Sequence, residues 1–327
     1  MKCLLLLIGL LLSTETLVAQ LSQIERFYPF SLPNITNPAN TGFFLNESSV
    51  PFFRIQSNNQ VEYHNTWNDF DTKLNLDYRR AVFKEDFLGF GFDYQLRKSF
   101  MKPSYENTYK IRASYQKHFG RRVKDVLSLG INVGVQDVNL STHRVWYYQQ
   151  EQGVSWMHPS DRDLYQVGLT HKMRFLLDDS SNNLHTSKWE HWAGLQGHGE
   201  WQLSRQVRLN FLVNYQYQFF GWNRFSKHLL GGTIATAYGF GRRRQHELIL
   251  GLGAKWMGWD VNHEIPLTYN FFAGYEYNKF RMMAHFSFRY NANHSTMNRA
   301  QTSYQFGLSL AYHIFRIRRL GGVPIWI

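Results

Sequence analysis

An alternation of apolar and polar residues with a period of two runs through most of this chain. In residues 207–219 the odd positions read Val, Leu, Phe, Val, Tyr, Tyr and Phe, whereas the even positions read Arg, Asn, Leu, Asn, Gln and Gln. The same pattern recurs in residues 127–136, 280–290 and 302–313. A period of two predicts β-strands with one apolar and one polar face, rather than helices.

The number and length of these segments favour a membrane barrel over a soluble sheet. Nine further strands are predicted at 51–65, 70–82, 86–99, 105–118, 162–176, 189–204, 228–241, 246–258 and 266–278. Soluble strands are usually about five or six residues long, and many of these are more than twice that. In lipid every backbone N–H and C=O must be paired, and a closed barrel leaves no strand edge. We therefore predict an all-β protein, a transmembrane antiparallel β-barrel.

The strand count is constrained by parity. Bacterial single-chain barrels have even numbers of strands, whereas about thirteen are visible in the sequence. We predict fourteen strands, with twelve as the alternative, and the extra strand comes from 142–150 or from the tail 321–327. Residues 141–161 form the longest break in the pattern and are expected to be an extended loop.

Aromatic residues support the membrane interpretation. Phe, Trp and Tyr make up 17% of the chain, and Tyr and Trp recur near predicted strand ends, where an interfacial girdle would lie. A large soluble β-sandwich or a lipocalin-like barrel is the alternative. We favour the membrane barrel because the apolar faces are long and a secretory signal precedes them.

The N-terminus has the features of a signal peptide. Lys2 is followed by an apolar run from Leu4 to Leu12, and cleavage is predicted after Ala19. The domains are then a signal peptide at 1–19, an irregular periplasmic or lumen-plugging segment at 20–48, the barrel at 49–316, and a tail or last strand at 317–327. The expected location is the outer membrane, in contact with its lipid.

Cysteine and charge exclude several function classes. Cys3 is the one cysteine and lies within the signal, so the mature chain has no disulfide, no thiolate nucleophile and no cysteine metal ligand. The net charge of +12 is spread over many strands, which argues against nucleic-acid binding. Short basic runs at 121–122, 242–244 and 316–319 suit solvated turns and lipid headgroups, or an acidic partner.

Charged residues on the polar faces are predicted to point into the lumen, because charge is costly against lipid. They are Asp93, Arg97, Lys110, Arg112, Lys172, Arg174, Arg208, Lys255, Arg281 and Arg289.

No catalytic or metal centre is evident. His191 and His198, with Glu200, fall in a predicted strand, where a seven-residue spacing places the two imidazoles on opposite faces. The glycines of 89–92 and 251–254 lack the phosphate-loop pattern, and we expect them to make room for neighbouring rings. No Gly-x-Ser-x-Gly is present. We expect no enzymatic activity and no cofactor, with an outer-membrane lipase as a remote alternative.

One stretch near the N-terminus carries a family resemblance. "FYPFSLPNITNPANTGFF" is followed by "FFRIQSNNQVEYHNTW", "FLGFGFDY" and "VLSLGINVGVQDVNL". This succession, within residues 20–140, resembles the PorP/SprF family of Bacteroidetes outer-membrane proteins. Asn37, Pro38, Ala39 and Gly42 match its Asn-Pro-Ala-x-x-Gly motif, and Arg54 and Trp67 fit its first hairpin, although Thr66 stands where Gln is usual.

The resemblance implies a role in the type IX secretion system. Family members accompany the secretion ring and motor components, or help to export and anchor large secreted adhesins, including those used in gliding motility. The expected partner is then a secreted adhesin or a secretion component. The alternative is a porin or FadL-like transport channel, whose lumen charges would set solute selectivity.

In either case we expect the motif to form an ordered turn that holds the N-terminal segment against the barrel. Pro38 would hold Asn37 in extended geometry, and Gly42 would permit the chain to bend towards the first strand.

Overall fold

A computed structural model provides the structure of this protein. It describes residues 37–41, 52–64, 68–83, 86–99, 104–119, 125–140, 143–159, 163–179, 189–220, 226–241, 246–259, 267–277, 280–291 and 301–313. The predicted signal peptide with its cleavage site, Gly42, Trp67 and the tail 317–327 lie outside these residues.

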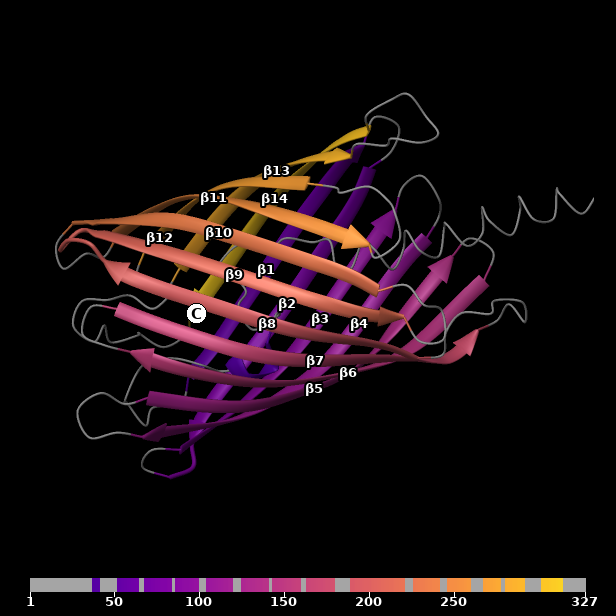
Figure 1. Cartoon of the computed structure of the whole chain (residues 1–327), viewed down its shortest axis with the longest axis horizontal. Helices are drawn as coiled ribbons and strands as arrows, with labels where there is room; N and C mark the ends of the chain where they lie inside the picture. Colours follow the sequence, from indigo (N-terminus) through magenta and orange to yellow (C-terminus); the bar gives the residue numbers. More distant parts are fainter. Residues whose placement is uncertain are drawn as a thin grey trace, which may run out of the picture.

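The described residues form fourteen antiparallel strands in one closed barrel, in which each strand pairs with its neighbours in sequence and β1 pairs with β14 (Figure 1). This confirms the predicted fold. The strands are β1 (Phe52–His64), β2 (Asn68–Ala81), β3 (Asp86–Ser99), β4 (Ser104–Phe119), β5 (Asp125–Leu140), β6 (His143–Pro159), β7 (Asp163–Asp179), β8 (Trp189–Gln202), β9 (Val207–Phe220), β10 (Ser226–Phe240), β11 (His246–Trp259), β12 (Leu267–Tyr277), β13 (Phe280–Asn291) and β14 (Gln301–His313).

The extra strand lies where a loop was expected. Residues 143–159 form β6, so the prediction of an extended loop at 141–161 is wrong, and 142–150 is confirmed as a source of the fourteenth strand. The alternation is present on the inner face, where Gln149, Glu151 and Ser155 are buried. It is hidden in the sequence because Gln150 and Gln152 occupy outward positions of the same strand.

The two faces of the barrel wall differ as the period of two predicts. On β11 the outward side chains of Leu248, Leu250 and Leu252 are 45%, 54% and 55% exposed, whereas the inward side chains of Glu247 and Ile249 are 3% and 1% exposed. The same division holds along most of the other strands, so a mainly apolar face meets lipid and a mainly polar face lines the lumen.

The two ends of the barrel differ in the length of their connections. At one end the connections are short, at 82–85, 160–162 and 278–279, and at the other end the longest span 180–188 and 292–300. Outer-membrane barrels have short periplasmic turns and longer extracellular loops, so we assign the short-connection end to the periplasm. Within the described residues, no helix is long and apolar enough to span a membrane.

A charge on the outer wall should destabilise the barrel. We expect Leu250→Arg to lower the free energy of unfolding from lipid vesicles by roughly 2–4 kcal/mol, because the guanidinium would lie in hydrocarbon. Asn214→Arg on the lumen side of β9 is the control, with an expected change below about 1 kcal/mol. Urea titration followed by tryptophan fluorescence measures both, and equal destabilisation would contradict the assignment of faces.

Candidate functional site: the Asn37–Thr41 segment and the lumen wall

The segment Asn37–Thr41 lies inside the barrel against β4, β5 and β6, and its residues are buried. Asn37 is extended, with φ −149° and ψ 115°, and Pro38–Asn40 form one turn of 3₁₀ helix, labelled η2. The Asn37 side-chain Oδ1 accepts a hydrogen bond from the Ala39 backbone N–H at 2.9 Å. The turn predicted for this motif is therefore present, with Asn37 in the extended geometry that a following proline favours.

A row of small residues on the inner wall makes space for this segment. Gly89, Ser114, Gly130 and Gly153 are directly paired across β3, β4, β5 and β6. A Cβ on Gly130 would lie 2.3 Å from the Ala39 backbone N, and one on Gly153 would lie 2.0 Å from the Asn37 side-chain oxygen. Glycine is therefore required at these positions by close approach rather than by backbone conformation.

Polar side chains of the wall bind the segment. Ser114 Oγ and Gln116 Nε2 donate hydrogen bonds to the Thr41 carbonyl oxygen at 2.6 and 2.8 Å. Gln166 Nε2 donates to Asn40 Oδ1 at 2.7 Å, and Asn37 Nδ2 donates to a β6 backbone carbonyl. Buried polar groups are costly when unpaired, so these bonds hold the segment in one place on the wall.

An ion-pair network borders the segment. Asp77 lies between two guanidinium groups: Arg54 contacts its Oδ2, and Arg112 Nη2 lies 2.8 Å from its Oδ1. Arg112 also pairs with Asp93 through Nε at 3.0 Å, and its Nη1 donates to Thr41 Oγ1 at 3.4 Å. The network therefore joins β1 to β4 and contacts the segment directly.

Gly91 allows this network to form. It is paired with Asp77 on one side and with Arg112 on the other. A Cβ at Gly91 would lie 2.8 Å from Arg112 Nη2 and 2.9 Å from Asp77 Oδ1. The guanidinium crosses β3 only because this position has no side chain.

These contacts correct one expectation about the glycines. The prediction that those of 89–92 make room for rings is wrong, because Gly89 faces the Thr41 carbonyl and Gly91 faces Arg112. For Gly251 the prediction is confirmed, since its Cβ would lie 2.2 Å from the Phe272 ring.

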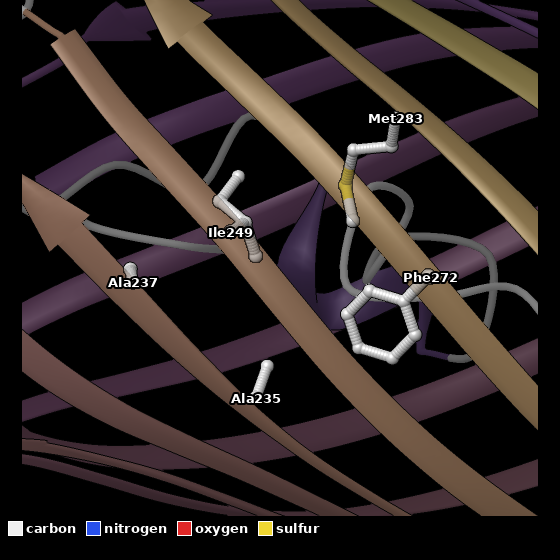
Figure 2. Close-up of a cluster of buried hydrophobic side chains, with 5 residues drawn as sticks. All are labelled: Ala235, Ala237, Ile249, Phe272 and Met283. Atoms are coloured by element: carbon white, nitrogen blue, oxygen red, sulfur yellow. The ribbon is translucent and has the colours of Figure 1, made fainter.

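The opposite part of the lumen wall carries an apolar cluster. Five buried side chains from β10, β11, β12 and β13 form a cluster, with Leu212 of β9 packed against it. Figure 2 shows these side chains on adjacent strands: Ala235, Ala237, Ile249, Phe272 and Met283. We call this the apolar sector. The ion pair between Arg208 and Glu247 also lies on these strands, so the sector is an apolar area within a largely polar lumen wall.

Polar atoms without hydrogen-bond partners surround the apolar sector. Among the described residues, both side-chain polar atoms of Gln56 and of Asn58 and both ring nitrogens of His285 are buried and unpaired. Asn270 Nδ2 and Ser309 Oγ are also buried and have no hydrogen-bond partner. Buried polar groups nearly always have partners, so the wall here can bind a polar group placed beside its apolar surface.

Most of the predicted lumen charges lie on the inner face. Asp93, Arg112, Arg174, Arg208, Lys255 and Arg281 are buried there. Arg97, Lys110 and Lys172 occupy inward positions and are half-buried, whereas the side chain of Arg289 lies outside the described residues. Arg174 pairs with Glu190, and Arg208 bridges Glu200 and Glu247. Carboxylates thus neutralise several of the cations.

The two histidines of β8 lie on opposite faces, as predicted. His198 is buried at 5% exposure on the inner face, whereas His191 faces outwards and contacts His171. Within the described strands no group of three or more His, Cys, Asp or Glu residues is placed to hold a metal.

Comparisons with known proteins support the fold. No protein-family model and no curated protein matches the chain. Among solved structures, the toluene transporter TodX of Pseudomonas putida is 10% identical, with TM-score 0.51 over 89% of this chain and 95% of that chain. A FadL homologue of Pseudomonas aeruginosa is 9% identical, with TM-score 0.52 over 88% of this chain and 95% of that chain.

At these identities the likeness concerns the fold alone. The class of this protein is an outer-membrane β-barrel with fourteen strands. Its particular features are an Asn37–Thr41 segment bound to the inner wall and an apolar sector on a lumen wall that is otherwise largely polar.

Filling the space beside the segment should displace it. In Gly130→Ala the new Cβ would collide with the backbone of Pro38 and Ala39. We expect a Cys placed at Ala39 to react with a membrane-impermeant maleimide at least tenfold faster in this variant, while the barrel stays folded. Gly231→Ala is the control, because its Cβ would have only one contact, at 3.9 Å. Unchanged labelling would contradict the close packing described here.

Removal of the shared carboxylate should destabilise the barrel. Asp77→Ala leaves the buried guanidinium groups of Arg54 and Arg112 without their shared carboxylate. We expect this to lower the free energy of unfolding by about 3 kcal/mol or more. The control is Asp125→Ala at one end of β5, whose side chain is 28% exposed and whose partner His158 is 39% exposed, with a cost below about 1 kcal/mol. Urea unfolding compares the two, and equal costs would show that burial does not strengthen the network.

Proposed function

We propose that this protein is an outer-membrane transport channel for small molecules that combine an apolar body with a polar group. The Asn37–Thr41 segment acts as its plug. The apolar sector carries this proposal, because a lumen for hydrophilic solutes has no need of an apolar wall.

The chemistry of the wall indicates the kind of molecule. The buried side chains of Ile249, Phe272 and Met283 would contact the apolar body. His285 and Asn58 beside them carry unpaired polar atoms that can bind a hydroxyl or carboxyl group. The solved barrels with similar folds include a toluene transporter and a monoaromatic hydrocarbon channel, which agrees with a small, largely apolar cargo.

The plug would control passage. It is held by hydrogen bonds from Ser114, Gln116 and Gln166 and by one contact from Arg112. Side chains can exchange such bonds for water at small net cost, so the segment can leave the wall without unfolding the barrel.

Binding of 1-naphthol tests the cargo class, since this fluorescent molecule has an apolar body and one hydroxyl. We expect saturable binding to the barrel in lipid nanodiscs, above the signal of empty nanodiscs. Phe272→Asp should weaken it at least tenfold, because a carboxylate would replace the ring of the apolar sector. Asn214→Asp adds the same charge to the lumen wall outside the sector and should leave binding within twofold. Absent binding, or equal weakening in both variants, would overturn the proposal.

A role in type IX secretion is the second candidate function. The observation that favours it is the ordered turn formed by Asn37, Pro38 and Ala39, the residues that carry the PorP/SprF resemblance. In this role the Asn37–Thr41 segment would seal the barrel. The loops between strands would bind a secreted adhesin or a secretion-ring component. Affinity purification from native membranes with mass spectrometry tests this role. Recovery of secretion-ring proteins or one very large adhesin supports it, and their absence removes it.

A further inference from the structure

The outer wall carries a polar patch on β6, β7 and β8, where lipid-facing residues are expected to be apolar. The patch consists of Gln150, Gln152, His171 and His191, all at outward positions of their strands. Gln152 is paired directly with His171 across β6 and β7. His191 Nδ1 lies 3.3 Å from His171 Nε2. We call these four residues the outer polar patch.

The depth of this patch can be judged from the tryptophans on the same strands. Trp146 and Trp156 both lie on the outer face of β6 and are ten positions apart (156 − 146). At about 3.3 Å per residue and a strand tilt of about 40°, this is about 25 Å, the height of the apolar band of such barrels. Gln150 and Gln152 therefore lie between the two aromatic girdles, at hydrocarbon depth.

The hydrogen bonding of the patch is incomplete. Elsewhere on the outer wall polar side chains bind each other, as in the bond from Thr72 Oγ1 to Asn59 Oδ1 at 2.9 Å. In the patch, Tyr148 donates to Gln150 Oε1 at 3.2 Å. The side chain of Gln152 is exposed and has no hydrogen-bond partner among the described residues. An amide left unpaired in hydrocarbon is costly, so a hydrogen-bond partner from a second molecule would be stabilising here.

The neighbouring surface permits close approach. Ala193 occupies the outward position of β8 that is paired directly with His171. A small residue beside polar ones lets a second surface approach closely, as it does between transmembrane helices.

We propose that the outer polar patch is the contact between two copies of this chain within the outer membrane. Carboxamides and imidazoles each carry a donor and an acceptor, so the patch complements itself. A two-fold axis brings the same surface of both copies together, and Gln152 of one copy then bonds with the patch of the other. None of the four side chains is a carboxylate or a permanent cation, so two copies meet without charge repulsion. This inference does not depend on the transport function.

Cysteine cross-linking in native membranes tests the proposal. Gln152→Cys is compared with Leu252→Cys, which lies on the outer wall of β11 at 55% exposure, and Cys3→Ser is included in both. With a short bis-maleimide we expect Gln152→Cys to give a band of twice the monomer mass and Leu252→Cys to remain monomeric. Cross-linking in both variants, in neither, or to a different protein would overturn the assignment.

A second variant separates association from folding. Gln150→Leu with Gln152→Leu and His171→Leu makes the patch apolar without adding charge or removing a lumen contact. We expect this variant to be monomeric in light scattering of the purified protein in detergent, where the unmodified chain is dimeric, and to unfold in urea at an unchanged or higher midpoint. A dimer that persists in the variant would overturn the proposal.

Discussion

The pairing of every backbone polar group within a closed sheet is the constraint on which the rest of this structure depends. Because the fourteen strands close through β1 and β14, each residue points either to lipid or to the lumen. The inner wall can then carry charge that lipid would not accept. Arg54, Asp77 and Arg112 form their network on this inner wall.

The Asn37–Thr41 segment binds to the same inner wall through side-chain hydrogen bonds rather than by strand pairing. It contributes no strand. The N–H groups of Ala39, Asn40 and Thr41 are paired within its own turn, and the Thr41 carbonyl accepts hydrogen bonds from side chains of β4. The row from Gly89 to Gly153 supplies the space, and Ser114, Gln116 and Gln166 supply the bonds. The segment and the apolar sector thus lie on different parts of the lumen wall, an arrangement that a channel with a removable plug can use.

The sequence allowed the architecture and parts of the site to be predicted, but not how those parts meet. The alternation identified thirteen strands and the inward direction of Arg112, Arg208 and Arg281, because a side-chain period of two follows from local backbone geometry. It missed β6, since Gln150 and Gln152 interrupt the outer apolar face. The roles of Gly130 and Gln116 were also missed, because contacts with Asn37–Thr41 span long sequence separations that no local pattern reports.

The sequence by itself determined the class of fold, the two faces of each strand and a conspicuous Asn-Pro-Ala turn near the N-terminus. These properties depend on neighbouring residues, on the preference of proline and on the cost of charge in lipid. Only the tertiary structure decided that the turn lies inside the barrel, that Gly91 lets Arg112 reach Asp77, and that Ile249, Phe272 and Met283 form one sector. Strand register decides these contacts, because it sets which residues of distant segments become neighbours.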